Sequence, residues 1–285
     1  MKLLLTGAYG IVGQEICAQL QRNCPDIEIT KIKGELPSFN EGLGKFDYII
    51  HGAGYGQPSK FKENFLSTFI INTENVYRLF QLAHPKTKIL YISTSEVYSG
   101  AKSPYRETDI GTTTPQHPRA CYIEGKRCGE AICIAYREQG YDVKIARLGL
   151  GYGPGTRKGD KRVLHSFIEQ GLHGDIILRD DGNAKRTYCY ISDAVEMMLN
   201  ILFKGTQDIY NVGGTSETTI KELAMTIARK MGYGIVVGKV NKPDLGAPDE
   251  VKLDTTRYEN EFGKKSFISL SEGLDKTIEW QKSLS

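Results

Sequence analysis

The chain has 285 residues, 40% of them hydrophobic and 25% charged, a composition typical of globular proteins that allows one large domain or two interleaved lobes. The formal net charge of +3 is small and evenly spread, so it favours neither nucleic acid nor a membrane as a partner. The sequence predicts no signal peptide or membrane span, and the six cysteines lack C-x-x-C or zinc-type spacing, so we expect a cytoplasmic protein without a metal site.

The first predicted element is a buried strand at residues 3–5, followed by a glycine turn and an amphipathic helix that ends near Leu20. The turn contains Gly7, Gly10 and Gly13. Such glycines permit a tight turn, close approach of the backbone to a pyrophosphate, and close packing of helix on strand. The free N–H groups at the start of the helix attract the anion. This order predicts a dinucleotide site, with a purely structural turn as the alternative.

Apolar, β-branched runs then alternate with helical patterns. Strands are predicted at residues 27–32, 48–50, 89–93 and 143–148, and helices at residues 68–82 and 123–139. Alternating strands and helices predict the α/β class with a doubly wound parallel sheet. Only residues 33–46 separate the second strand from the third, which is barely enough for a crossover, so the first half of the sheet is expected to be trimmed.

The end of the second strand reads Thr30-Lys31-Ile32-Lys33 and lacks the acidic residue that binds an adenine ribose in many NAD sites. Lys31 or Lys33 could accept a 2′-phosphate, which would favour NADP. Either lysine could equally be a solvated residue at a strand end. The strand itself therefore leaves the choice between NAD and NADP open.

After Leu150 the pattern loosens, and residues 151–155 are predicted to form a turn. We therefore divide the chain into a dinucleotide-binding domain at residues 1–150 and a smaller, mainly substrate-binding lobe at residues 151–285. The chain is expected to return to the first domain between residues 187 and 213, through strands near 188–191 and 209–212.

Tyr122 and Lys126 lie four residues apart in a predicted helix, so both side chains can point into one cleft. The spacing alone is weak evidence, because the chain has 16 tyrosines and many lysines. A solvated lysine beside a half-buried tyrosine is the simpler alternative. The Thr94-Ser95-Glu96 run at the end of a predicted strand supports a catalytic site instead.

Taken in order, these motifs resemble the extended short-chain dehydrogenase/reductase family of nucleotide-sugar enzymes, over nearly the whole chain. The resemblance is carried by Thr6-Gly7-x-x-Gly10-x-x-Gly13, His51-Gly52-Ala53, residues 93–98, Tyr122 with Lys126, residues 147–154, Lys185-Arg186 before residues 190–193, and residues 211–214. Within the family, Pro118 to Arg127 is similar to the active-site helix of UDP-glucuronate decarboxylases, which also carry Thr-Ser-Glu. The resemblance implies a doubly wound Rossmann sheet, a nucleotide-sugar substrate, NAD as cofactor, and a homodimer packed through the helix of Tyr122 and a neighbouring helix.

The resemblance also implies roles for particular residues. The cofactor would be bound by Gly7, Tyr9, Gly10, Ile11, Val12, Gly13, Gly52, Ala53, Gly54, Ser93, Tyr122 and Lys126. The catalytic residues would be Thr94, Ser95, Glu96, Tyr122, Lys126 and Arg186. The substrate would be bound by Thr94, Glu96, Tyr122, Arg162 and Arg186.

Oxidising a sugar hydroxyl requires a base, and Tyr122 is expected to serve once its pKa is lowered. A lowering of about three units needs roughly 4 kcal/mol, close to what one positive charge at about 4 Å supplies at an effective dielectric near 20. Lys126, helped by oxidised nicotinamide, is expected to provide it. Oxidation at C4 of a UDP-hexuronate places a ketone β to the carboxylate, which then leaves as carbon dioxide, and re-reduction regenerates NAD.

Two alternatives remain open. A nucleotide-sugar 4,6-dehydratase or 4-epimerase shares the first oxidation and differs afterwards. A non-catalytic dinucleotide-binding sensor would keep the glycines without needing Tyr122, Lys126 or Glu96. The sugar pocket is also expected to differ from the family pattern, because Leu150 stands where the family usually has an asparagine.

Overall fold

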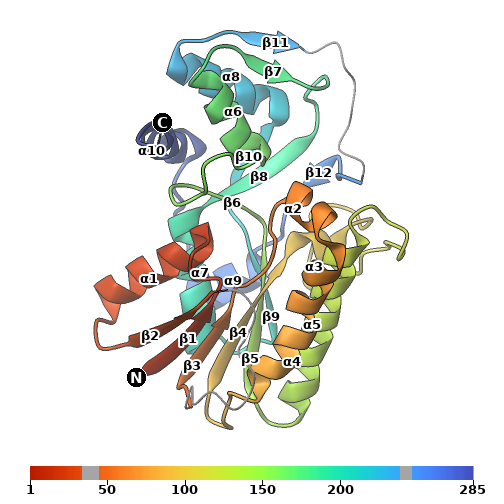
Figure 1. Cartoon of the computed structure of the whole chain (residues 1–285), viewed down its shortest axis with the longest axis vertical. Coiled ribbons are helices and arrows are strands. Elements are labelled where there is room, and N and C mark those ends of the chain that lie inside the picture. The colour runs from red at the N-terminus through yellow and green to blue at the C-terminus, as the bar shows by residue number, and fades with distance from the viewer. Residues whose placement is uncertain (34–44, 238–245, 285) are drawn as a thin grey trace.

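The computed structural model describes residues 1–33, 45–237 and 246–284, and its elements form two lobes (Figure 1). The larger lobe is built on a parallel sheet. In spatial order its strands are β2 (Glu28–Ile32), β1 (Lys2–Thr6), β3 (Tyr48–His51), β4 (Lys88–Thr94), β5 (Asp142–Leu148) and β9 (Ile209–Val212). The predicted α/β class and doubly wound parallel sheet are therefore confirmed.

Both faces of this sheet are covered by helices, because successive side chains of each strand point to opposite faces. Leu3 and Leu5 of β1 join the apolar cluster under α1 (Ile11–Asn23) and α7 (Ile191–Lys204). Leu4 joins the cluster on the other face, which is covered by further helices (Figure 1). These are α3 (Phe65–Asn72), α4 (Glu74–Phe80) and α5 (Ala120–Glu138). The short helix α2 (Pro58–Glu63) precedes them and contacts α3 and α5.

The direction of winding reverses beside β1. The chain runs from β1 outward to β2 and then crosses back to β3, on the other side of β1. Such a switch point leaves a crevice at the carboxyl ends of the two central strands, where open α/β sheets bind ligands. In the described residues β2 is the outermost strand on this side. The short crossover predicted for residues 33–46 falls mostly on residues 34–44, outside the described ranges.

The smaller lobe contains a second sheet with the path β10 (Ser216–Thr219), β8 (Lys185–Tyr190) and β12 (Glu250–Val251), and β6 (Leu150–Tyr152) also pairs with β8. A two-stranded sheet pairs β7 (Ile176–Leu178) with β11 (Ile235–Val237). The helices of this part are α6 (Val163–Gly171), α8 (Ile220–Met231) and α10 (Leu270–Lys282), whereas α9 (Thr256–Phe262) contacts β9. A capping box between Thr219 and Glu222 starts α8.

Three sequence expectations need correction. The single helix predicted at residues 68–82 is two helices, because Thr73 leaves the helical conformation and its hydroxyl donates to the Phe69 carbonyl. Residues 188–191 do not return to the large sheet, since β8 pairs with β10 and β6 in the smaller lobe; the return is made by α7 and β9. The turn predicted at residues 151–155 begins within β6.

No helix in the described ranges combines the length and the apolar character needed to cross a bilayer.

Candidate active site

The glycine turn after β1 has the geometry of a dinucleotide cradle. Gly7 has φ +74°, and a Cβ there would lie 2.4 Å from the Gly52 carbonyl oxygen at the end of β3. A Cβ on Gly13 would lie 2.3 Å from the Gly7 oxygen, so this glycine is required for helix–strand packing. At Gly10 the nearest atom to an added Cβ is 3.5 Å away. Gly10 is also the N-cap of α1 and offers no side-chain cap, so backbone N–H groups at the start of this helix remain available to an anion.

The other residues predicted to bind the cofactor lie around this turn. Tyr9 is exposed, Ile11 and Val12 are partly buried at the start of α1, and Gly52, Ala53 and Gly54 follow β3. The structure thus brings the two glycine segments together. Ser93 is the exception, because its hydroxyl donates to the carboxylate of Glu130 on α5. Lys31 and Lys33 are exposed at the end of β2.

Tyr122 and Lys126 project from the same face of α5 and are 9% and 4% exposed. The Lys126 ammonium donates to the Ile92 carbonyl at 2.8 Å and lies 4.8 Å from the ring centroid of Tyr91. A Cβ on Gly54 would lie 3.9 Å from the Lys126 nitrogen. The helix therefore carries its lysine to the edge of the predicted cofactor cradle.

The pKa of Tyr122 shifts in the direction opposite to the prediction. Burial raises the pKa of Tyr122 to about 12, although a hydrogen bond with Thr94 and the charge of Arg162 act to lower it. The expected lowering by Lys126 is absent among these causes, since the ammonium points to the Ile92 carbonyl. Burial also lowers the pKa of Lys126 to about 8, against the opposing charge of Glu130.

The Thr94-Ser95-Glu96 run lies at the carboxyl end of β4 and opens the 3-10 helix η1 (Ser95–Tyr98). Thr94 is within hydrogen-bonding reach of Tyr122. Glu96 forms an ion pair with the guanidinium of Arg119, the N-cap residue of α5, which is 4% exposed. Arg119 was not among the residues predicted from the sequence, although it lies in the segment from Pro118 to Arg127, one helical turn before Tyr122.

The smaller lobe contributes two further guanidinium groups. Arg162 pairs with Asp160 at 2.7 Å, and its charge acts on the pKa of Tyr122. Arg186 of β8 donates to the carbonyls of Lys185 and Asp249. Burial lowers the pKa of Arg186, and both Arg119 and Glu96 are among its electrostatic neighbours. The two lobes thus bring the predicted catalytic and substrate-binding residues to one region.

A buried ion pair supports this region from behind. The Glu130 carboxylate accepts from Arg147 of β5 at 3.0 Å (Nε) and 2.7 Å (Nη2). Arg147 also donates to the Tyr98 hydroxyl at 2.8 Å. Through Ser93 and Arg147, Glu130 ties α5 to the ends of β4 and β5.

Leu150, the departure from the family pattern, lies in β6 and packs against an apolar cluster that includes Val97, Tyr98, Tyr105 and Leu253. Leucine has no hydrogen-bonding group, so this side chain cannot contact a substrate as an asparagine would. Within the described ranges, His, Cys, Asp and Glu side chains form no group of three or more that could hold a metal ion.

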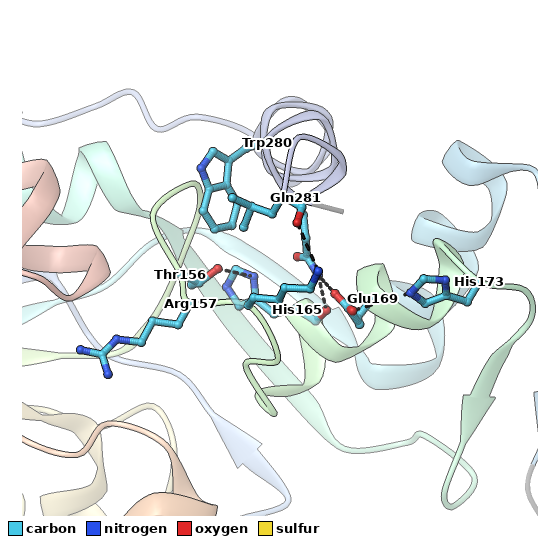
Figure 2. Close-up of a pocket in the computed structure, with 9 residues that line it drawn as sticks. Thr156, Arg157, His165, Glu169, His173, Trp280 and Gln281 are labelled. Carbon is cyan, nitrogen blue, oxygen red and sulfur yellow. Dashed lines mark hydrogen bonds and ion pairs between the residues drawn. The ribbon is translucent and has the colours of Figure 1, made fainter.

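A cavity of about 120 Å³ lies elsewhere in the smaller lobe, between the loop at residues 156–158, α6 and α10 (Figure 2). Figure 2 shows Thr156 directed at His165, with a hydrogen-bonding distance of 3.3 Å. Gln281 of α10 donates to the His165 carbonyl and to Glu169. The lining contains none of the site residues predicted from the sequence, so this cavity is not the candidate active site.

Comparison with known proteins agrees with this arrangement. Residues 3–213 match the NAD dependent epimerase/dehydratase family. The chain is 28% identical to UDP-glucuronic acid decarboxylase 1 of Xenopus tropicalis over 98% of this chain and 72% of that protein. It is 29% identical to UDP-glucuronic acid decarboxylase 5 of Arabidopsis thaliana, over 96% of this chain and 87% of that protein.

Solved structures share the fold over the full length of both chains. UDP-glucuronic acid 4-epimerase from Bacillus cereus, in complex with UDP-glucuronic acid and NAD, superposes with a TM-score of 0.84 at 22% identity. UDP-glucose 4-epimerase from Thermotoga maritima, with UDP-glucose, gives a TM-score of 0.84 at 23% identity. At these identities the likeness establishes the architecture alone.

Proposed function

The chain belongs to the NAD-dependent epimerase/dehydratase family of enzymes, so its cofactor is NAD, and from that premise we propose that it decarboxylates UDP-glucuronate to UDP-xylose. The reaction would pass through a 4-keto sugar and leave no net oxidation of the substrate. The names of the decarboxylase relatives support this choice. The observation that carries it is the ion pair between Glu96 and Arg119, with Arg186 nearby, beside Tyr122 and Thr94.

This cluster suits a uronate better than a neutral hexose. A guanidinium group binds a carboxylate through charge-assisted hydrogen bonds, each worth roughly 1.5–3 kcal/mol. Arg186 is partly buried, and its pKa is lowered mainly because burial removes water from the guanidinium. A substrate carboxylate beside the guanidinium would replace part of that lost hydration. The negative charge of Glu96 would repel any carboxylate that approached this cluster without pairing with a guanidinium.

The glycine cradle, the 52–54 segment and Lys126 would hold the cofactor. NAD, when bound, supplies the hydride acceptor for the first oxidation and the hydride donor for the last reduction. Thr94 would orient the C4 hydroxyl of the sugar, and Tyr122 would remove its proton. Arg162 would bind the diphosphate of the substrate.

The C4 ketone then stands β to the carboxylate, so the C5–C6 bond breaks and its electrons form an enolate as carbon dioxide leaves. Glu96 and Ser95, with Arg186, would position the carboxylate and relay one solvent proton to C5. Tyr122 returns its proton to the C4 oxygen as the ketone is reduced. In this balance one proton is consumed and one carbon dioxide is released.

Product analysis tests the proposal. We expect proton NMR to show UDP-xylose from UDP-glucuronate, and no reaction with UDP-glucose, dTDP-glucose or GDP-mannose. Conversion of a neutral hexose to a 4-keto-6-deoxy sugar would instead identify a dehydratase. Inversion of the uronate at C4 without carbon dioxide release would identify an epimerase. Binding of NAD without turnover of any of these sugars would favour the non-catalytic sensor.

The variant Arg186→Lys sharpens this test, because lysine keeps the charge but loses the planar fork. We expect weaker binding of UDP-glucuronate and at least tenfold slower turnover. Arg229→Lys, on the exposed side of α8, is the matched control and should behave like the wild type. Equal activity of the two variants would remove Arg186 from the proposed site.

We also propose that the functional unit is a homodimer packed through α3, α4 and α5. The outward side of α3 and α4 is apolar, with Phe65, Leu66, Phe69, Ile70 and Tyr77 exposed. The opposite side of α3 packs on α5 through Thr68 and Asn72. A second copy presenting the same helices would cover this surface.

A further inference from the structure

The short helix α2 places an aromatic ring directly on Tyr122. Phe61 is the buried residue of this six-residue helix and is 1% exposed. Its ring lies parallel to that of Tyr122, with centroids 4.8 Å apart and an interplanar angle of 1°. The Cys121 thiol donates to the Phe61 carbonyl at 3.6 Å. Both contacts join α2 to the first turn of α5.

A helix of this length is not stable by itself, because nucleation costs more than one turn of hydrogen bonds returns. Pro58 at the first helical position fixes its start, and Lys60 and Glu63 form an exposed ion pair worth little. Burial of the Phe61 ring is therefore the main apolar contact that holds α2 on α5.

Stacking covers one face of the phenol ring of Tyr122. Rotation of the Tyr122 ring about its Cβ–Cγ bond would break the parallel contact, so Phe61 restricts the plane of the ring. Thr94 lies within hydrogen-bonding reach of the phenol oxygen. A reacting group held in one orientation gains much of its rate from that positioning, and a displacement of about 1 Å can cost a factor near 10².

From this contact we infer that Phe61 is a positioning residue for the reaction: its ring fixes the plane of Tyr122 and excludes water from the covered face. The inference rests on the proposed role of Tyr122 as the base. Phe61 itself lacks a group that could transfer a proton, so it acts only through Tyr122. Removing the ring should misplace and hydrate the phenol while leaving the cofactor cradle intact.

Three variants separate positioning from general stability. Phe61→Met keeps an apolar side chain of similar volume without a ring face. Phe61→Tyr keeps the ring. Tyr233→Leu is the matched control, because Tyr233 is a half-exposed aromatic residue just after α8 in the smaller lobe. Should Phe61→Met fail to fold, Phe61→Leu carries the same comparison.

We expect Phe61→Met to lower kcat at least tenfold while the affinity for NAD stays within about threefold of wild type. Phe61→Tyr should keep kcat within about threefold, and Tyr233→Leu should match the wild type. The limb of the pH–kcat profile that requires deprotonated Tyr122 should move to lower pH in Phe61→Met, because water that reaches a buried phenol lowers its pKa. Unchanged kcat and an unchanged limb in Phe61→Met would overturn the inference, as would an equal loss in Phe61→Tyr.

A measurement without substrate distinguishes this inference from the proposed function. In protein labelled at the tyrosine Cζ carbon, the NMR signal missing from Tyr122→Phe identifies Tyr122. We expect this signal to stay in its protonated position up to pH 11 in the wild type and to titrate at lower pH in Phe61→Met. Identical titrations would refute the positioning role even if the enzyme is active. If the wild type converts none of the sugars while Phe61→Met still titrates at lower pH than the wild type, the proposed function fails and the contact between Phe61 and Tyr122 stands.

Discussion

Tyr122 carries the chemistry assigned to this site, and its own surroundings keep its phenol protonated at neutral pH. Burial dominates, and the nearby negative charge of Glu96 adds to it. Lys126 is directed at a backbone carbonyl. If Tyr122 is the base at neutral pH, the positive charge of an oxidised nicotinamide in the cradle would have to lower its pKa, because Lys126 does not do so in this arrangement.

The variant Tyr122→Phe tests the role of the phenol hydroxyl. Removing the hydroxyl leaves the ring stacked on Phe61, so the variant should fold and still bind NAD. Loss of a general base should lower turnover at least a hundredfold. Single-turnover kinetics with UDP-glucuronate and calorimetry with NAD check the two halves. Near-wild-type turnover would assign the base to another residue.

Lys126 gives a prediction about stability. Its pKa is about 8 in the folded protein and about 10.4 when unfolded, so between these values the unfolded chain binds more protons. The free energy of unfolding then rises with pH across this window, because the buried ammonium of Lys126 loses its proton in the folded protein before it does so in the unfolded chain. The free energy of unfolding of wild type minus that of Lys126→Met should increase by roughly 3 kcal/mol from pH 7 to pH 11. If urea unfolding shows the same difference between wild type and Lys126→Met at every pH, the lowered pKa of Lys126 is contradicted.

Elements differ in how far their sequence determines them. The glycine turn and α5 are predictable, since a strand–glycine–helix order and a helical repeat are local patterns. The break at Thr73 is harder, because apolar residues continue on both sides of it. The pair between Glu96 and Arg119 joins residues 23 apart, and it depends on the approach of η1 to the start of α5. The sign of the Tyr122 pKa shift likewise depends on burial by α2, which no spacing in the sequence indicates.

The buried Glu130–Arg147 pair gives the prediction for these elements. Glu130→Gln removes a carboxylate and leaves the Arg147 guanidinium buried without its counter-charge. We expect the variant to lose roughly 3–5 kcal/mol of stability in urea unfolding. Glu138→Gln, on the exposed end of the same helix, should stay within about 0.5 kcal/mol of wild type. Equal stability of the two variants would show that the pair contributes nothing to the fold.

The whole molecule forms its candidate site from both lobes: Tyr122 and Glu96 come from the large sheet and its helix, and Arg162 and Arg186 from the smaller lobe. The sequence predicts the large sheet because its strands are buried on both faces and alternate with helices. It assigns β8 to the wrong sheet, because the pairing of β8 with β10 and β6 is long-range and is not specified by a local pattern.

A prediction at this scale concerns assembly. Leu66 is 79% exposed at the centre of the apolar side of α3. A charge there should be tolerated by the monomer and opposed by a dimer that buries it. We expect Leu66→Asp to halve the mass seen by sedimentation or light scattering, whereas Met225→Asp, an exposed apolar position on α8 of the smaller lobe, keeps the dimer. A wild type that sediments as a monomer would refute the proposed assembly.

The reaction of UDP-glucuronate in deuterium oxide, followed by NMR, tests most directly whether this enzyme is a decarboxylase. Decarboxylation through a 4-keto sugar protonates C5 from solvent, so we predict UDP-xylose with a single deuterium at the C5 methylene, released carbon dioxide, and no accumulation of NADH. A uronate inverted at C4 without deuterium or carbon dioxide would contradict it.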